Sequence, residues 1–143
     1  MGFKAKEFDE LTTTELYEIL KARAEIFVAE QKIIYVDMDD IDYRWRHFFL
    51  ENDGKVIAYL SAFYEDESTV HIGRVLSLKH GTGLGKEVLE KAIDDIKRNM
   101  KCAGIRLNSQ SYAVGFYEKS GFKTVSEEFL IENIPHYTME FAL

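Results

Sequence analysis

The feature that most constrains the fold is a glycine-rich turn in the middle of the chain. Residues 78–93 read LKHGTGLGKEVLEKAI, in which a glycine stands at every second position from Gly81 to Gly85. An apolar stretch rich in β-branched residues, 70–78, precedes the turn, and apolar residues with helical spacing follow it up to Met100. A strand, a tight turn and a helix in this order are typical of α/β proteins.

The rest of the chain adds further strands and helices around this unit. Thr12 and Glu15 have the spacing of a capping box at the start of an amphipathic helix, whereas the acidic segment 33–45 predicts a loop with a short helical turn. Further strands are predicted at 46–52, 55–64, 104–110, 124–131 and 136–143, and a short helix at 112–122 that ends at Gly121. This order predicts an α/β (α+β) fold with a mixed, mostly antiparallel central sheet and helices on both faces. Strand pairing is expected to change from antiparallel to parallel near the glycines. Ligands tend to bind α/β sheets at such a switch point.

Length and composition exclude several classes of protein. The 143 residues suffice for a single domain, 1–143, with one sizeable core. A formal net charge of -7 argues against a nucleic-acid-binding protein, and Cys102 as the only cysteine excludes an intramolecular disulfide. No apolar run approaches the roughly 20 residues of a membrane span, and the N-terminus lacks an apolar signal segment. A cytoplasmic protein without nucleic-acid or membrane partners is expected.

The glycine turn differs from two common nucleotide-binding motifs. A Walker loop needs four residues between its glycines and a Ser or Thr after its lysine, whereas three residues separate Gly81 from Gly85 and Glu87 follows Lys86. The dinucleotide fingerprint G-x-G-x-x-G is absent, because the chain reads G-x-G-x-G here. Backbone amides at the start of the helix, together with Lys86, would suit a pyrophosphate. A turn that binds no ligand is the alternative.

A second motif, about thirty residues later, gives the turn a family context. AVGFYEKSGFKTV (113–125) follows HGTGLGKEVLEKAI at a spacing that resembles the GCN5-related N-acetyltransferase (GNAT) superfamily. In that family the first motif, Arg/Gln-x-x-Gly-x-Gly/Ala, binds the pyrophosphate of acetyl-CoA through backbone amides, and the second, F-Y-x-x-x-G-F, packs beside the pantetheine arm. The resemblance maps the first motif onto Gly83 and Gly85, and the second onto Phe116, Tyr117, Gly121 and Phe122.

Other segments resemble the ElaA-like branch of this superfamily. They are IFVAEQKIIYVDMDDID (26–42), RHFFL (46–50), LNSQ (107–110) and IPHYTM (134–139). Two features differ from the family pattern. His80 stands where Arg or Gln is usual, and GRVLSLKHGTG is about two residues shorter than the usual connection between strand and loop. In the family that connection includes the bulged strand whose backbone pairs with pantetheine and polarises the thioester.

The resemblance implies direct transfer of an acetyl group from acetyl-CoA to an amine, which requires a base, an oxyanion donor and an acid. Tyr117 is the expected acid for the CoA thiolate, with a purely structural core tyrosine as the alternative. A backbone N–H within residues 76–78 is the expected oxyanion donor. Glu30 and His136 are the expected catalytic bases and His47 is a further candidate, although each histidine could instead be structural. The expected acetyl-CoA-binding residues are Leu76, Ser77, Leu78, His80, Gly81, Thr82, Gly83, Leu84, Gly85, Lys86, Asn108, Phe116 and Tyr117, and the expected acceptor-binding residues are Glu30, Gln31, His47, Gln110 and His136.

Two questions stay open at the level of sequence. Asp37, Asp39, Asp40 and Asp42 form either a solvated acidic loop or an electrostatic attraction for a cationic acceptor. The chain is either an N-acetyltransferase acting on the primary amine of a small molecule or protein, or a non-catalytic module that binds CoA or an acyl-CoA. No metal is expected, because four scattered histidines and one cysteine do not make a usual zinc ligand set. The oligomeric state is not predicted.

Overall fold

The computed structural model describes residues 1–32 and 37–143, which form a single mixed sheet with helices on both faces. The strands are β1 (Gly2–Glu7), β2 (Arg46–Asn52), β3 (Lys55–Tyr64), β4 (Thr69–Ser77), β5 (Gly104–Gln110), β6 (Lys123–Thr124), β7 (Phe129–Ile131) and β8 (Ile134–Ala142). Their order is β1-β2-β3-β4-β5-β8-β6, and β7 pairs with β8. Every pairing is antiparallel except that of β4 with β5. The predicted mixed, mostly antiparallel sheet is therefore confirmed.

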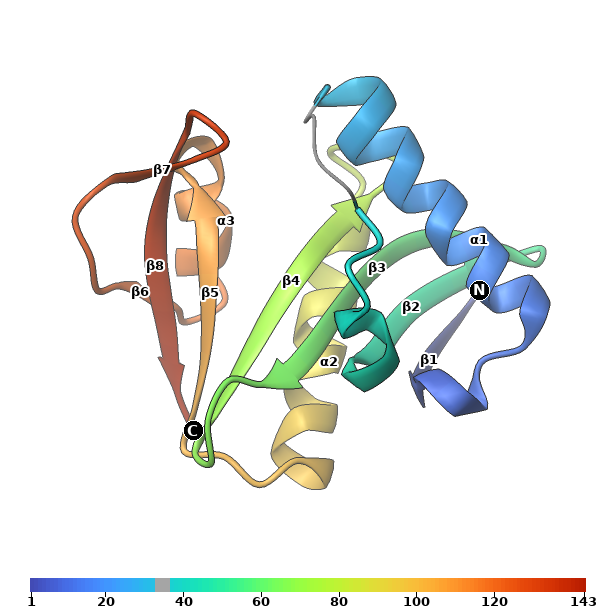
Figure 1. Cartoon of the computed structure of the whole chain (residues 1–143), viewed down its shortest axis with the longest axis horizontal. Helices are drawn as coiled ribbons and strands as arrows, with labels where there is room; N and C mark the ends of the chain where they lie inside the picture. The colour runs from blue at the N-terminus through green and yellow to red at the C-terminus, as the bar shows by residue number, and fades with distance from the viewer. Residues whose placement is uncertain (33–36) are drawn as a thin grey trace.

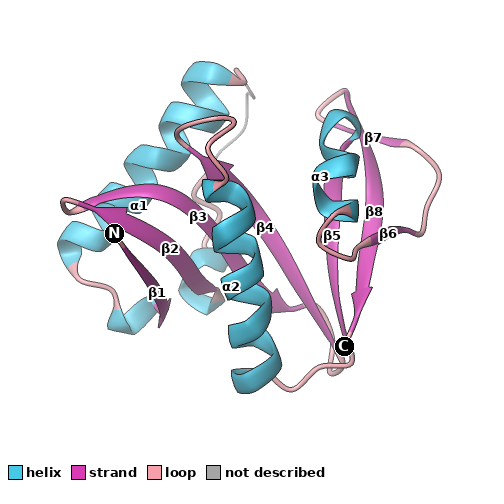
Figure 2. Ribbon diagram, turned by 180° about the vertical axis from the view of Figure 1, so that it is seen from behind, coloured by secondary structure: helices cyan, strands magenta, loops and turns pink. Residues whose placement is uncertain are grey.

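In the part of the chain that the structure describes, three α-helices cover the two faces of the sheet. Helix α1 (Thr13–Arg23) continues as a π-helical segment (Ala24–Glu30), and α2 (Leu84–Asn99) and α3 (Val114–Glu118) complete the set. Figure 1 shows α1 in front of β2 to β4 and α2 behind them. Figure 2, seen from behind, shows α2 and α3 on the same face. No helix within the described residues is long and apolar enough to cross a membrane.

Helix α1 begins where the sequence predicts. The Glu15 backbone N–H donates to the Thr12 hydroxyl at 3.0 Å, and the Thr12 N–H donates to the Glu15 carboxylate at 2.8 Å, which completes the capping box. The same carboxylate accepts hydrogen bonds from Lys4 and Lys6 of β1, so that it also ties α1 to the edge of the sheet. Burial opposes ionisation of Glu15, but these hydrogen bonds outweigh it and lower its pKa to about 2.

Successive side chains of the strands point to opposite faces of the sheet, and each face carries its own hydrophobic core. In β2, Phe48 and Leu50 point toward α2, whereas Phe49 points toward α1. The larger core packs α2 against β2 to β5 and also includes Tyr117 and Phe122 from the second motif. The smaller core packs α1 and the π-helical segment against β2, β3 and β4.

The C-terminal strands differ from the prediction in one respect. Residues 124–131 were expected as one strand. In the structure they form two, β6 and β7, which both pair with β8 and are separated by residues 125–128. Strands β7 and β8 form a hairpin in which Ile131 is paired with Ile134. Its two turn residues, Glu132 and Asn133, have φ angles of 50° and 61°, as a type I′ turn requires. In the acidic segment, residues 33–36 lie outside the described residues, and a 3-10 turn at Ile41–Arg44 matches the expected helical turn.

Candidate functional site

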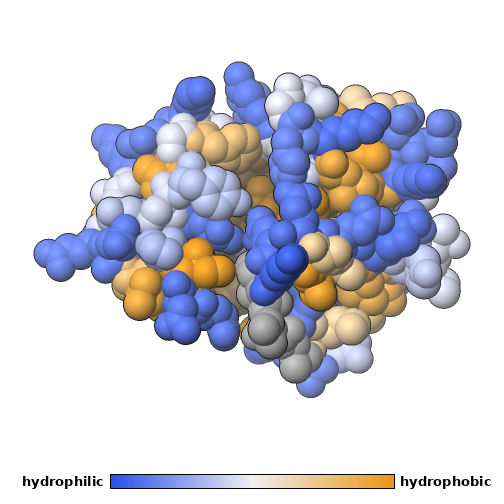
Figure 3. All heavy atoms as spheres, turned by 90° about the horizontal axis from the view of Figure 1, so that it is seen from above, coloured by the Kyte–Doolittle hydropathy of each residue, from blue (hydrophilic) through white to orange (hydrophobic). Residues whose placement is uncertain are grey.

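The site lies where β4 and β5, the only parallel pair of strands within residues 1–32 and 37–143, separate. Strands β4 and β5 are paired over just three positions, the last of which joins His71 to Arg106. Beyond this point the strands diverge, and we call the space between them the fork (Figure 1). Residues 72–75 of β4 and 107–110 of β5 line a cavity of about 330 Å³ in the fork. Figure 3, viewed from the open end, shows a mostly hydrophilic surface with hydrophobic side chains in the hollow between two lobes.

The glycine turn forms a loop of exposed backbone beside the fork. Gly81 and Gly83 have φ angles of 73° and 81°, a conformation that side chains rarely adopt, and Gly83 is the N-cap of α2. The hydroxyls of Ser77 and Thr82 both donate to the Lys79 carbonyl and hold the loop together. No side chain among the described residues caps the N-terminus of α2, so the first amides of the helix are available to an anion.

The two predicted motifs meet in space. A Cβ placed on Gly85 would lie 3.5 Å from Cζ of Phe116 and 3.8 Å from Cβ of Ser77. Helix α3, which carries Phe116 and Tyr117, therefore packs next to the start of α2. The glycine loop, the end of β4 and α3 thus form one continuous wall.

Tyr117 is a buried residue that lines the cavity. Only 9% of its surface is exposed, and its ring contacts Phe116 and Phe122 edge-on. Burial, with a smaller contribution from Tyr112, raises the pKa of the phenol above its ordinary value. No described group forms a hydrogen bond with the hydroxyl, which stays protonated and available to a ligand.

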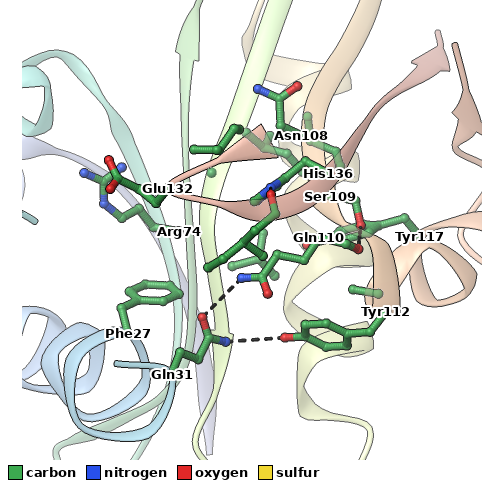
Figure 4. A pocket seen from close by; sticks show the side chains of 17 residues that line it. Phe27, Gln31, Arg74, Asn108, Ser109, Gln110, Tyr112, Tyr117, Glu132 and His136 are labelled. Atoms are coloured by element: carbon green, nitrogen blue, oxygen red, sulfur yellow. Dashed lines mark hydrogen bonds between the residues drawn. The ribbon is translucent and has the colours of Figure 1, made fainter. Parts of the chain in front are cut away.

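His136 lies on β8 and lines the same cavity. Its Nδ1 is 2.7 Å from the carbonyl oxygen of Ile134. Because a carbonyl can only accept a hydrogen bond, Nδ1 carries the proton and Nε2 of the neutral ring has a free lone pair. No described residue binds Nε2. His136 therefore lines the cavity with one ring nitrogen that has no hydrogen-bond partner among the described residues (Figure 4).

Amide side chains connect the two lobes across the fork. Nε2 of Gln110 donates to Oε1 of Gln31 at 3.2 Å, and Nε2 of Gln31 donates to the Tyr112 hydroxyl at 3.4 Å (Figure 4). Gln31 directly follows the π-helical segment, whereas Gln110 is the last residue of β5 and Tyr112 lies in the short helical turn after it. The structure therefore brings the predicted acceptor residues Gln31, Gln110 and His136 together around one cavity.

Glu30 and His80 pair with each other outside the cavity. Nε2 of His80 is 2.7 Å from Oε1 of Glu30, and both side chains are at least half exposed. The pair joins the π-helical segment to the glycine loop. Neither residue lines the fork cavity.

His47, which was expected to bind the acceptor, is buried in the core and does not line the fork cavity. It is 1% exposed, its Nδ1 is 2.6 Å from the Tyr59 hydroxyl, and its Nε2 is 3.1 Å from the Asp42 carbonyl. It lies on the same side of β2 as Phe49, where the α1 core covers it. Burial lowers its pKa.

Three of the four aspartates of the acidic loop, Asp37, Asp39 and Asp42, are paired with arginines. The Asp37 carboxylate bridges two arginines, with 2.8 Å to Nε of Arg23 and 2.9 Å to Nε of Arg74. Asp42 binds Arg23 at 2.8 Å, and Asp39 binds Arg74 at 3.1 Å. Arg23 is 1% exposed, so its charge depends on these partners.

The other predicted cofactor residues are distributed along the loop and the fork. Asn108 lines the cavity and accepts a hydrogen bond from Thr138 at 2.9 Å. Leu76 packs in the α1 core, and the Leu78 N–H donates to the Ile57 carbonyl at 2.9 Å, so this amide is not free to serve as an oxyanion donor. Lys86 is exposed in the first turn of α2. The cavity also contains residues that the sequence did not indicate, namely Phe27, Arg74, Tyr112 and Glu132.

The chain is similar to known proteins over nearly its whole length. Residues 7–143 match the family model of the acetyltransferase (GNAT) domain. A UPF0039 protein of Schizosaccharomyces pombe is 36% identical over 147 residues, which cover 100% of this chain and 98% of that protein. The crystal structure of an acyl-CoA N-acyltransferase from Pseudomonas aeruginosa superposes with a TM-score of 0.92 at 34% identity, covering 99% of this chain and 100% of that one. Escherichia coli ElaA superposes with a TM-score of 0.91 at 26% identity, with 98% of each chain covered.

Proposed function

The chain belongs to the GNAT family of acetyltransferases, and we propose that it transfers the acetyl group of acetyl-CoA to a primary amine. The family and the fold support transfer of an acyl group from a CoA donor. The observation that carries the finer proposal is a single cavity that joins the fork to a basic nitrogen of His136 and to the phenol of Tyr117.

Acetyl-CoA is proposed to bind with its pyrophosphate over residues 81–86 and its pantetheine arm in the fork. The positive φ angles of Gly81 and Gly83 and the uncapped start of α2 support the pyrophosphate position. Lys86 adds a positive charge on the first turn of the helix. The unpaired edges of β4 and β5 offer backbone groups to the amides of pantetheine.

The proposed reaction is a direct attack of the amine on the thioester, without an acetylated enzyme intermediate. The amine nitrogen attacks the thioester carbonyl carbon, a C–N bond forms, and the C–S bond breaks. Nε2 of His136 accepts the proton that the amine loses, and the Tyr117 hydroxyl donates a proton to the departing CoA sulfur. A phenol is protonated at neutral pH, so the Tyr117 hydroxyl carries a proton to donate as the thiolate forms.

We assign the base to His136 rather than to Glu30. The Glu30 carboxylate is already bonded to His80 and does not line the cavity. Glu30 instead links the π-helical segment to the loop that is proposed to hold pyrophosphate. The acceptor enters between this segment and the β7–β8 hairpin, where Gln31, Gln110 and Glu132 supply polar groups.

The test of this function compares two matched tyrosine variants. CoA release is followed with a thiol reagent, and mass spectrometry identifies the acetylated product from a linear polyamine, an aromatic amine, an aminoglycoside and a lysine-containing peptide. Loss of general acid assistance should lower kcat of Tyr117→Phe by at least about tenfold. The affinity for acetyl-CoA and the Tm should change little, because the ring remains. Tyr17→Phe, on the exposed face of α1, is the control and should match the parent.

Two results would contradict the proposal in different ways. If Tyr117→Phe turns over like the parent, Tyr117 is a packing residue and another group protonates the thiolate. If the parent binds acetyl-CoA tightly but acetylates none of the amines, the chain is a non-catalytic CoA-binding module.

A further inference from the structure

Strand β4 contains a bulge at the mouth of the fork. Opposite β3, Tyr59 pairs with Leu76 but Ser61 pairs with Gly73, so β4 has one more residue than β3 between these pairs. Arg74 lies in the bulge with a φ angle of 55°, which is unusual for a residue with a side chain. Residues 72–75 all line the cavity, and the bulge therefore shapes the edge of β4 that faces the fork.

A strained backbone persists only where its surroundings fix it. The Arg74 side chain supplies such a restraint, because its Nε donates to Oδ1 of Asp37 at 2.9 Å and its Nη2 donates to the Asp37 carbonyl at 2.7 Å. A further bond joins Nη2 to Oδ2 of Asp39 at 3.1 Å. The guanidinium also lies 5.9 Å from the ring centre of Trp45.

The restraint is anchored in turn to the buried side of α1. The second carboxylate oxygen of Asp37 accepts from Nε of Arg23 at 2.8 Å, and the Asp37 carbonyl accepts from Nη2 of Arg23 at 2.9 Å. The Trp45 ring packs closely against Gly73, the residue before Arg74. A Cβ on Gly73 would lie 3.1 Å from this ring. The bulge is thus connected through Asp37 to the C-terminal end of α1.

We propose that Asp37 and Asp39 are positioning residues that act through Arg74 to hold the β4 bulge in the shape that presents its backbone to the thioester. This inference rests on the proposed function. Strand β5 cannot support the bulge, because β4 and β5 are no longer paired at this point. The acidic loop supplies the missing support from outside the sheet. Its aspartates serve the reaction by fixing the backbone, not by attracting the acceptor.

The test exploits the difference between alanine and glycine at residue 74. Both Arg74→Ala and Arg74→Gly remove the ion pairs, but glycine adopts a φ angle of 55° without strain. With the most rapidly acetylated amine from the panel above, Arg74→Ala should lower kcat by about a hundredfold, which is the usual cost of misplacing reacting groups by about 1 Å. Arg74→Gly should keep a kcat at least about fivefold above that of Arg74→Ala. KM for acetyl-CoA should change less than about threefold, because the glycine loop is unaltered.

The variant Asp39→Asn provides a second test of the same proposal. It leaves the buried Arg23 paired with Asp37 and Asp42. It should lower kcat by about fivefold or more while the protein stays folded, because it weakens the Arg74 contact, whereas the amide oxygen of asparagine can still accept from the Ile41 N–H. Asp40→Asn in the same loop is the matched control and should retain the parent kcat, since no described residue forms an ion pair with Asp40. Replacement of Asp37 is avoided because it would remove one of the two carboxylates that pair with the buried Arg23 and so would disturb α1 as well as Arg74.

The outcomes separate this inference from the proposed function. Equal losses in Arg74→Ala and Arg74→Gly would overturn the inference, because the Arg74 side chain would then act on the substrates directly. Parent-like kcat in Arg74→Ala or Asp39→Asn would also overturn it. An inactive parent would refute the proposed function itself, and with it the inference.

Discussion

Replacing Gly83 by alanine separates the stability of the glycine loop from its capacity to bind acetyl-CoA. Gly83 has a φ angle of 81°, and no described atom beyond its chain neighbours lies within 4 Å of the position that a Cβ would take. Alanine therefore meets no clash, but its backbone is held in the left-handed region at a cost of about 1–2 kcal/mol. For a chain of this length, the cost should lower the Tm by about 2–8 °C.

Binding should suffer separately from stability. The open space above Gly83 is where the pyrophosphate is proposed to lie, so a methyl group there would hold the phosphates away from the amides of α2. A hydrogen bond to a charged group contributes about 1.5–3 kcal/mol. Losing even one such bond should raise the Kd for acetyl-CoA by about tenfold or more.

The chain offers a matched control in the turn between β2 and β3. Gly54 has a φ angle of 76° and equally open surroundings, so Gly54→Ala imposes the same strain far from the loop. Thermal melts should show similar losses for the two variants, whereas calorimetric titration with acetyl-CoA should show weaker binding only for Gly83→Ala. Equal affinities for the two variants would refute the placement of the pyrophosphate.

Two further predictions concern pH and salt. Burial lowers the pKa of His47 in the folded protein, so the unfolded chain binds that proton more readily, and the stability from neutral His47 is complete above about pH 6.5 and is lost as the pH falls through the folded pKa. The free energy of unfolding in urea should therefore decrease below about pH 6.5, and the decrease should be smaller in His47→Gln; an identical decrease in both proteins would contradict this assignment. Because Asp37, Asp39 and Asp42 are paired with arginines, kcat/KM for a cationic amine should change less than about twofold between low and moderate salt, and a steep fall would restore a steering role for the loop.

Local features of the fold could be predicted because they depend on neighbouring residues. The capping box at Thr12 and Glu15 and the glycine turn before α2 each act within one turn of chain, and both occur in the structure. The second motif correctly indicated a short helix carrying Tyr117 next to the glycines. The gap between β6 and β7 was missed, because apolar residues at 129–131 do not show where pairing stops.

Long-range contacts explain what the sequence could not predict at the site. Whether a histidine faces the core or the cavity depends on the side of the strand it occupies, and His47 shares its side with Phe49. The restraint on the bulge joins Asp37 to Arg74 across 37 residues, with no periodic signal between them. The positive φ angle of Arg74 could not be predicted from the sequence either, because glycine is the residue that usually indicates such a conformation.

A crystal structure of the protein with bound CoA tests the central claim most directly. The account predicts that pyrophosphate contacts the amides of residues 81–86, that pantetheine lies between β4 and β5, and that the CoA sulfur is within hydrogen-bonding reach of the Tyr117 hydroxyl. A CoA molecule bound outside the fork, or a sulfur remote from both Tyr117 and His136, would contradict it.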